Sequence, residues 1–154
     1  MSAKRRRRPL KKHELVAKLP RAFRPRLDRE QIRDLALSHT TNLDVIARGE
    51  GNEEILWQVV GGVFTWSQAA EMLDLGVDEM SAQLELVTRL VERYGATGRV
   101  IFTGVEYQLA KRGVLVMDML AEVVDRPTAI AATDWAQAQL DSLHGARAAQ
   151  AALS

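Results

Sequence analysis

The 154-residue chain contains no cysteine, four prolines and only 5% aromatic residues. The absence of cysteine excludes disulfides, thiolate metal ligands and cysteine nucleophiles. No apolar run approaches the roughly 20 residues that a membrane-spanning helix needs, and no apolar segment follows the N-terminal basic cluster as in a secretory signal. Few aromatic residues together with many Ala, Leu and Val residues favour packed helices over a β-sandwich. We therefore expect an all-α, cytoplasmic protein that does not contact a membrane.

Positive charge is scarce outside one end of the chain. Residues 1–33 hold 13 Lys/Arg against 3 Asp/Glu, a net charge of +10, whereas the remaining residues hold 8 Lys/Arg against 17 Asp/Glu, a net charge of −9. The overall formal charge of +1 therefore conceals a basic segment joined to an acidic body. Such a basic segment predicts an anionic partner, such as a nucleic acid, an acidic protein surface or lipid headgroups.

Residues 1–27 are predicted to form a flexible basic arm. Pro9, Pro20 and Pro25 each remove a helical hydrogen-bond donor and favour extended backbone before them. The predicted nucleic-acid-binding residues are the seven basic residues near its start: Lys4, Arg5, Arg6, Arg7, Arg8, Lys11 and Lys12. Seven cations within nine residues can contact several phosphates in a salt-dependent and largely sequence-independent way. A solubilising tail and an arm that docks on an acidic protein surface remain alternatives.

Apolar residues at three- and four-residue spacing predict about five helices between residues 28 and 145, packed as one bundle domain. The Ala-rich residues 146–154 are expected to form a frayed tail after Gly145 ends the last helix. The residues predicted to cap the helix N-termini are polar residues before each apolar stripe: Asp28, Asn52, Asp78, Thr103 and Thr128. The apolar run of residues 100–102 is either a short strand or a loop.

Two adjacent glycines interrupt the second predicted helix. Gly61 and Gly62 each cost about 1 kcal/mol of helix stability relative to Ala. Their presence predicts either the close approach of a neighbouring helix or a kink.

Residues with catalytic or metal-binding chemistry are sparse. The three histidines, His13, His39 and His144, lie in different segments and lack the spacing of zinc ligands. His39 is predicted to be a polar residue at a helix boundary. No Gly-rich segment is followed by the Lys-Ser/Thr of a phosphate loop, and no Gly-x-Ser-x-Gly nucleophile motif occurs. We expect a protein without enzymatic activity, cofactor or metal ion.

Residues 67–87 show some likeness to a DNA-binding helix-turn-helix. The second of the two helices would, however, present Asp78, Glu79 and Glu85 to the phosphates, whereas recognition helices present Arg, Lys, Asn or Gln to base edges. These residues are therefore predicted to form an ordinary helix pair of the bundle.

Four residues are predicted to contact a protein partner. Asp78, Glu79 and Glu85 are candidates for an acidic surface that meets a basic protein. Trp66 lies outside the main apolar stripe of its helix and would be an anchor for a partner if it were exposed. A position in the core is the favoured alternative for Trp66.

Several segments resemble a group of uncharacterised small helical accessory proteins encoded on plasmids, prophages and integrated elements of Proteobacteria. The matching segments are KRRRRPLKK, LALSHTTNLDVIARGEGNEEILWQVVGG, AAEMLDLGV, ATGR and VVDRPTAIAATDWAQAQL. The resemblance implies a mobile-element accessory protein that acts on host or competitor machinery without catalysis.

These observations together predict a non-catalytic mobile-element protein that binds a nucleic acid or a nucleoprotein complex through its basic arm. The alternative is an inhibitor of a bacterial defence complex, such as a CRISPR–Cas interference complex, whose acidic helical body occupies a basic nucleic-acid groove. A third possibility is a homo-oligomer that associates through Trp66 and the Ala-rich last helix.

Overall fold

The computed structural model describes residues 29–153 of the chain. The predicted phosphate-contacting residues and the predicted cap Asp28 lie outside the described residues, so the arm is not part of the description that follows.

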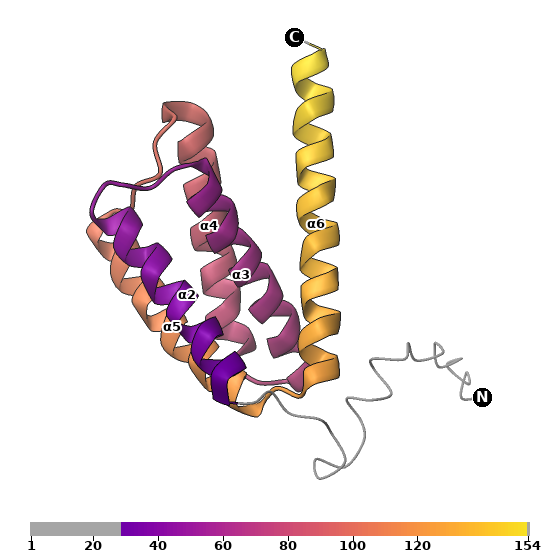
Figure 1. The fold of residues 1–154 in the computed structure, drawn as a ribbon. Helices are drawn as coiled ribbons and strands as arrows, with labels where there is room; N and C mark the ends of the chain where they lie inside the picture. The colour runs from indigo at the N-terminus through magenta and orange to yellow at the C-terminus, as the bar shows by residue number, and fades with distance from the viewer. Residues whose placement is uncertain (1–28, 154) are drawn as a thin grey trace, which may run out of the picture.

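Residues 29–153 form five helices, and no strand occurs within this range. The helices are α2 (Arg29–Ala47), α3 (Glu53–Leu73), α4 (Val77–Thr97), α5 (Gly104–Val123) and α6 (Arg126–Ala152). The prediction of an all-α bundle of about five helices is confirmed. Helices α2 and α5 lie side by side, and α6 runs along α3 with its C-terminal turns extending past the other helices (Figure 1). Among the described helices, α6 packs on α3 alone.

Two of the predicted N-caps are confirmed. The Asn52 side chain accepts a hydrogen bond from the Ile55 N–H at 2.9 Å and thereby caps α3. At α5, Thr103 and Glu106 form a capping box, in which the Glu106 N–H donates to Thr103 Oγ1 at 3.2 Å and the Thr103 N–H donates to Glu106 Oε1 at 2.8 Å. Polar side chains thus pair the backbone donors that begin both helices.

Two other predicted N-caps are wrong. Helix α4 begins at Val77 after Gly76, which takes a left-handed conformation with φ of 68°, so Asp78 lies inside the first turn. Helix α6 is capped by Asp125, whose Oδ1 accepts from the Thr128 N–H at 2.8 Å. Pro127 lies within the first turn of α6, where its missing N–H costs no intrahelical hydrogen bond. The predicted cap Thr128 is instead a fully buried residue of that turn.

The expected helix end at Gly145 is also wrong, because α6 continues to Ala152. A glycine inside a helix costs only about 1 kcal/mol relative to Ala, and the neighbouring alanines are the strongest helix formers. The residues expected to form a frayed tail are therefore the last turns of α6.

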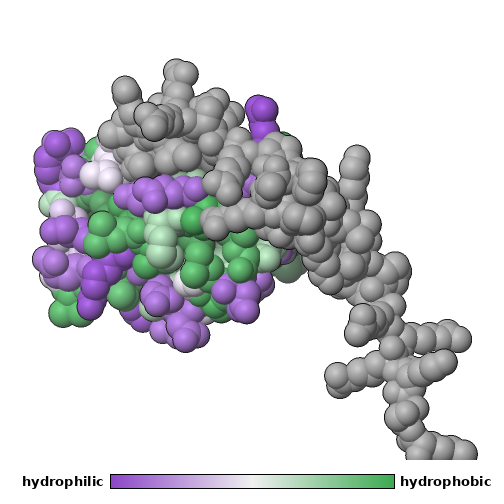
Figure 2. All heavy atoms as spheres, turned by 90° about the horizontal axis from the view of Figure 1, so that it is seen from below, coloured by the Kyte–Doolittle hydropathy of each residue, from purple (hydrophilic) through white to green (hydrophobic). Residues whose placement is uncertain are grey.

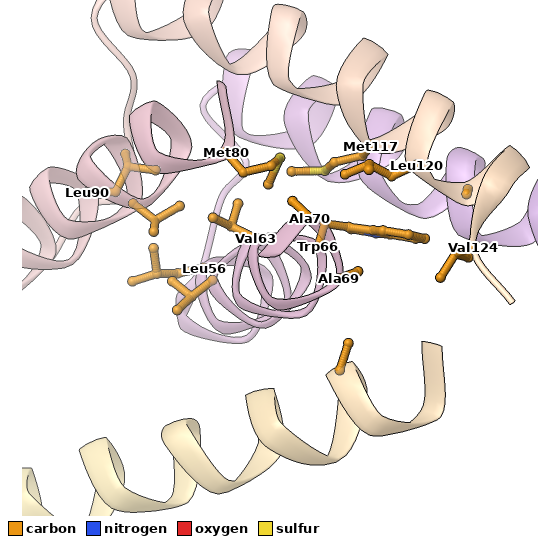
Figure 3. Close-up of a cluster of buried hydrophobic side chains, with 14 of the residues drawn as sticks. Leu56, Val63, Trp66, Ala69, Ala70, Met80, Leu90, Met117, Leu120 and Val124 are labelled. Carbon is orange, nitrogen blue, oxygen red and sulfur yellow. The ribbon is translucent and has the colours of Figure 1, made fainter. Parts of the chain in front are cut away.

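The hydrophobic core lies around α3, which contacts every other described helix. Leu56, Val63 and Trp66 of α3 meet side chains from α4 and α5 (Figure 3). Residues 100–102 form a loop between α4 and α5, and Val100 is buried in the core.

The glycine pair of α3 allows two different helices to approach closely, so the prediction of a close approach is confirmed. A Cβ on Gly61 would lie 3.2 Å from Leu140 Cδ1 of α6, and a Cβ on Gly62 would lie 2.8 Å from His39 Cε1 of α2. The two neighbours flank α3 at consecutive residues, so each glycine has its own steric reason.

Candidate interaction surfaces

Trp66 belongs to the core rather than to the surface. Its side chain is 2% exposed and lies near Met117, Leu120 and Val124 of α5 and of the turn that follows it (Figure 3). The hypothesis of an exposed anchor for a partner is therefore wrong, and the core alternative is confirmed. Helices pack on several sides of α3, so α3 buries more than one of its faces, and Trp66 lies on a buried face.

His39 lies inside α2, and the prediction that it stands at a helix boundary is wrong. Its Nε2 accepts a hydrogen bond from Trp66 Nε1 at 2.8 Å, and the two rings meet edge to face. Burial lowers the pKa of His39 below its ordinary value of 6.5. His39 thus joins α2 to α3. His144 lies apart from it, because its ring contacts Trp57 near the other end of α3.

The predicted acidic interaction residues are exposed on α4. Asp78 and Glu79 lie in its first turn, and Glu85 lies two turns further on. Asp78, Glu85 and Glu92 are spaced by seven residues, which places them on one face of the helix, whereas Glu79 is rotated from that face by about 100°. The structure therefore brings Asp78 and Glu85 into one row with Glu92, a residue that the sequence analysis did not include.

Sequence reasoning missed an ion-paired cluster between α4 and α5. Arg93 of α4 grips the buried Glu106 carboxylate with both ends of its guanidinium, at 2.8 Å from Nη1 to Oε1 and 3.1 Å from Nη2 to Oε2. Arg93 Nη1 also donates to the Ile101 carbonyl at 2.7 Å, and Arg89 Nε lies 3.5 Å from Glu106 Oε2. The cluster ties α4, the loop and the start of α5 together.

The electrostatics of this cluster keep Glu106 ionised. The hydrogen bond from Arg93 is the main reason why the pKa of Glu106 falls from 4.5 to about 2, and it outweighs the opposing effect of burial. The same hydrogen bond raises the pKa of Arg93. With its oxygens bound to Arg93, Arg89 and the Thr103 N–H, Glu106 acts as a structural anion. Its position in a capping box was visible in the sequence, but no local signal identifies its partner 13 residues upstream.

A second buried polar contact joins the same two helices. Gln83 of α4 is 3% exposed, and its Nε2 donates to the Leu109 carbonyl of α5 at 3.0 Å. The amide lies directly on Gly113, where a Cβ would overlap the carboxamide of Gln83. The missing side chain at Gly113 therefore makes room for the buried amide.

Two hollows of different size are lined by described residues. A cavity of about 20 Å³ lies among α2, α3, α4 and α5, with His39 and Gln83 as its polar lining residues, and this volume suits about one water molecule. A surface groove of about 340 Å³ lies where α2 ends and α5 begins, lined by Ile46, Ile101, Phe102 and Tyr107 among others. Among the residues whose side chains the structure describes, 38–146 and 148–153, no group of three His, Asp or Glu is placed to hold a metal ion.

Hydrophobic side chains also reach the surface. On α5, Val105 is 79% exposed and Leu115 is 69% exposed, and α6 exposes Ile130 and Leu143. Seen from below, hydrophobic side chains gather in the middle of the coloured part of the surface, and hydrophilic side chains lie mainly around them (Figure 2).

Comparisons with known proteins found no matching family model, no matching curated protein and no matching solved structure. None of the helices in the described part of the chain is both long enough and apolar enough to cross a membrane.

Proposed function

We propose that this protein binds a nucleic acid, alone or within a nucleoprotein complex, through the basic residues that precede its helical bundle. The observation that carries the proposal is the division of charge, +10 over residues 1–33 and −9 over the rest. A cluster of Lys and Arg binds phosphates mainly by releasing their counterions. In line with the resemblance to mobile-element accessory proteins, we assign the chain a non-catalytic role.

The acidic body favours a defined orientation of the complex. Phosphates would repel the row formed by Asp78, Glu85 and Glu92, which is exposed along α4. A nucleic acid held by the basic residues therefore lies away from this face of α4. The body would then limit how much of the nucleic acid one protein molecule contacts.

The direct test is binding of the full-length protein to a fluorescent 30-base-pair DNA duplex, measured by anisotropy between 50 and 200 mM salt. Seven phosphate contacts predict a slope of log K against log salt of about −6, and replacing Arg5 through Arg8 with Ala should bring it to about −3. A matched control is the double variant Lys111→Ala and Arg112→Ala, two exposed cations of α5, which should leave the slope unchanged.

Single-stranded DNA and an RNA hairpin of equal charge identify the preferred nucleic acid in the same assay. Absence of binding to all three probes at 50 mM salt contradicts the proposal. An unchanged slope after replacement of Arg5 through Arg8 contradicts the assignment of these residues.

A second candidate function is inhibition of a bacterial defence complex through the acidic row of α4. The specific observation is that Asp78, Glu85 and Glu92 repeat every seven residues on one helix face, about 10 Å apart, and are all exposed. Such a row could occupy a basic nucleic-acid groove by charge mimicry. Reversal of the three carboxylates to Lys should abolish competition with DNA for a CRISPR–Cas interference complex, whereas the arm variant should retain it.

A further inference from the structure

The His39–Trp66 hydrogen bond has a fixed direction. An indole N–H can only donate, so Nε2 of His39 must be unprotonated to accept the bond at 2.8 Å, and the proton of the neutral ring is on Nδ1. In a doubly protonated imidazole Nε2 carries a hydrogen, so two donors would face each other and the hydrogen bond would be lost. The contact between α2 and α3 therefore depends on the charge state of one side chain.

We propose that the His39–Trp66 hydrogen bond is a proton-sensitive latch between α2 and α3, closed when the imidazole is neutral and opened when it is protonated. The latch joins residues that are 27 apart in the sequence, in two helices that also meet at Gly62. The inference does not depend on the proposed function, because it concerns the stability of the bundle.

His39 is half-buried, and its ring packs against α3. The ring lies against the α3 backbone, since a Cβ on Gly62 would come within 2.8 Å of Cε1 and 3.1 Å of Nδ1. Protonation would place a positive charge against the indole N–H of Trp66 and the backbone of Gly62. The outcome is a weaker α2–α3 contact rather than a rearranged hydrogen bond.

Among the residues whose side chains the structure describes, His39 is the only ionisable one that lines the cavity beside its ring. The residues that line it with His39 come from α2 to α5 and the loop before α5: Leu43, Val59, Val63, Gln83, Leu86, Val87, Leu90, Phe102, Ala110, Val114 and Met117. The acidic residues Glu71 of α3 and Glu79 and Glu85 of α4 are exposed, as is Asp44 of α2, and Asp118 of α5 does not line the cavity. None of the lining residues in the described part of the chain carries a negative charge that could offset an imidazolium.

The sign of the effect follows from burial. Burial lowers the pKa of His39 in the folded protein, so the unfolded chain binds the proton more tightly. The stability that neutral His39 contributes is complete above pH 6.5 and is lost as the pH falls below 6.5 toward the pKa of the folded state. One such group lowers the ratio of folded to unfolded protein by up to about tenfold per pH unit in that interval.

The experiment is urea unfolding of the full-length protein at pH 7.5 and pH 5.5, with the variants His39→Gln and His144→Gln. Gln can place its side-chain oxygen near the position of Nε2 and keep an acceptor for Trp66 without titrating. His144 is exposed and serves as the matched control. Between pH 7.5 and pH 5.5, the folded-to-unfolded ratio of the wild type and of His144→Gln should fall by up to about tenfold more than that of His39→Gln.

Comparison between variants isolates His39, because the carboxylates and His13 are common to all three proteins. Glu106 contributes its own acid sensitivity only below pH 4.5, and Asp118, whose pKa is raised by burial and by Glu122, acts in the opposite direction in every variant. Equal pH dependence in the wild type and His39→Gln would overturn the proposal.

A second measurement keeps the proposal testable if His39→Gln does not fold. Nitrogen NMR of the wild type should show His39 as the Nδ1–H tautomer at pH 7.5, with a midpoint of protonation below 6.5. The Trp66 indole signal, assigned by its loss in Trp66→Phe, should shift with the same midpoint. An Nε2–H tautomer, a midpoint at or above 6.5, or an indole signal that does not follow His39 would each overturn the latch.

Discussion

Replacement of Glu106 by Gln should destabilise the bundle in a way that depends on pH. The substitution keeps the size of the side chain and an oxygen for the Thr103 N–H, which donates to Glu106 at 2.8 Å. It removes the negative charge that Arg93 grips at 2.8 and 3.1 Å. The perturbation therefore isolates the charge of a buried carboxylate that is already fully hydrogen-bonded.

The magnitude follows from the pKa of Glu106. A fall from 4.5 to about 2 corresponds to about 3 kcal/mol of folding free energy, because each pKa unit is worth about 1.4 kcal/mol. Breaking one side of a buried ion pair costs a similar amount in other proteins, about 3–5 kcal/mol. Since the pKa is lowered, this stability is present above pH 4.5 and is lost as the pH falls through about 2.

The assay is urea unfolding followed by circular dichroism at pH 7, 4.5, 3 and 2. At pH 7 the Gln variant should be less stable than the wild type by about 3 kcal/mol, and the difference should shrink steadily below pH 4.5. Glu85→Gln is the control, because Glu85 is exposed and exposed substitutions usually change stability by less than about 0.5 kcal/mol. A stability difference that stays constant from pH 7 to pH 2 would refute the reasoning.

Four further substitutions test the packing and one helix cap. Gly62→Ala should lower the stability by about 1–3 kcal/mol, because its Cβ would lie 2.8 Å from His39 Cε1. Gly145→Ala, whose Cβ would meet no atom within 4 Å, should instead raise the stability by about 0.5–1 kcal/mol. Thermal unfolding of the two variants measures both effects, and equal effects would contradict the close approach at Gly62. Leu56→Ala should cost about 2–5 kcal/mol in urea unfolding, since Leu56 is fully buried, and a loss below 1 kcal/mol would contradict its place in the core. Asn52→Ala should cost about 1 kcal/mol in the same assay through loss of the cap on the Ile55 N–H, and an unchanged stability would argue against that cap.

Much of the fold could be predicted from the sequence because its signals are local. The apolar spacing predicts the helices, and the caps Asn52 and Thr103 act on backbone groups three residues away. The pair Gly61 and Gly62 predicted a close approach of helices, because two glycines inside a helix lower its stability and a close approach explains their presence. These signals need no knowledge of which helix lies next to which.

The errors arose where the outcome depends on neighbours in space. Trp66 looked peripheral on one helix, but α3 is covered on several sides and buries it. Arg93 and Glu106 meet only because α4 and α5 pack together, and the same holds for His39 and Trp66. At Gly145 the prediction gave a single glycine more weight than its cost of about 1 kcal/mol justifies in an alanine-rich helix.

The adjacent glycines of α3 also determine where the chain can change in length. Consecutive helix residues point about 100° apart, so inserting or deleting one residue before Gly61 would turn both glycines away from Leu140 and His39. Two neighbouring helices would then meet side chains where they now meet backbone. Insertions and deletions should therefore be excluded from α3 and tolerated in the exposed parts of the connections, such as the turn at Arg48–Glu50.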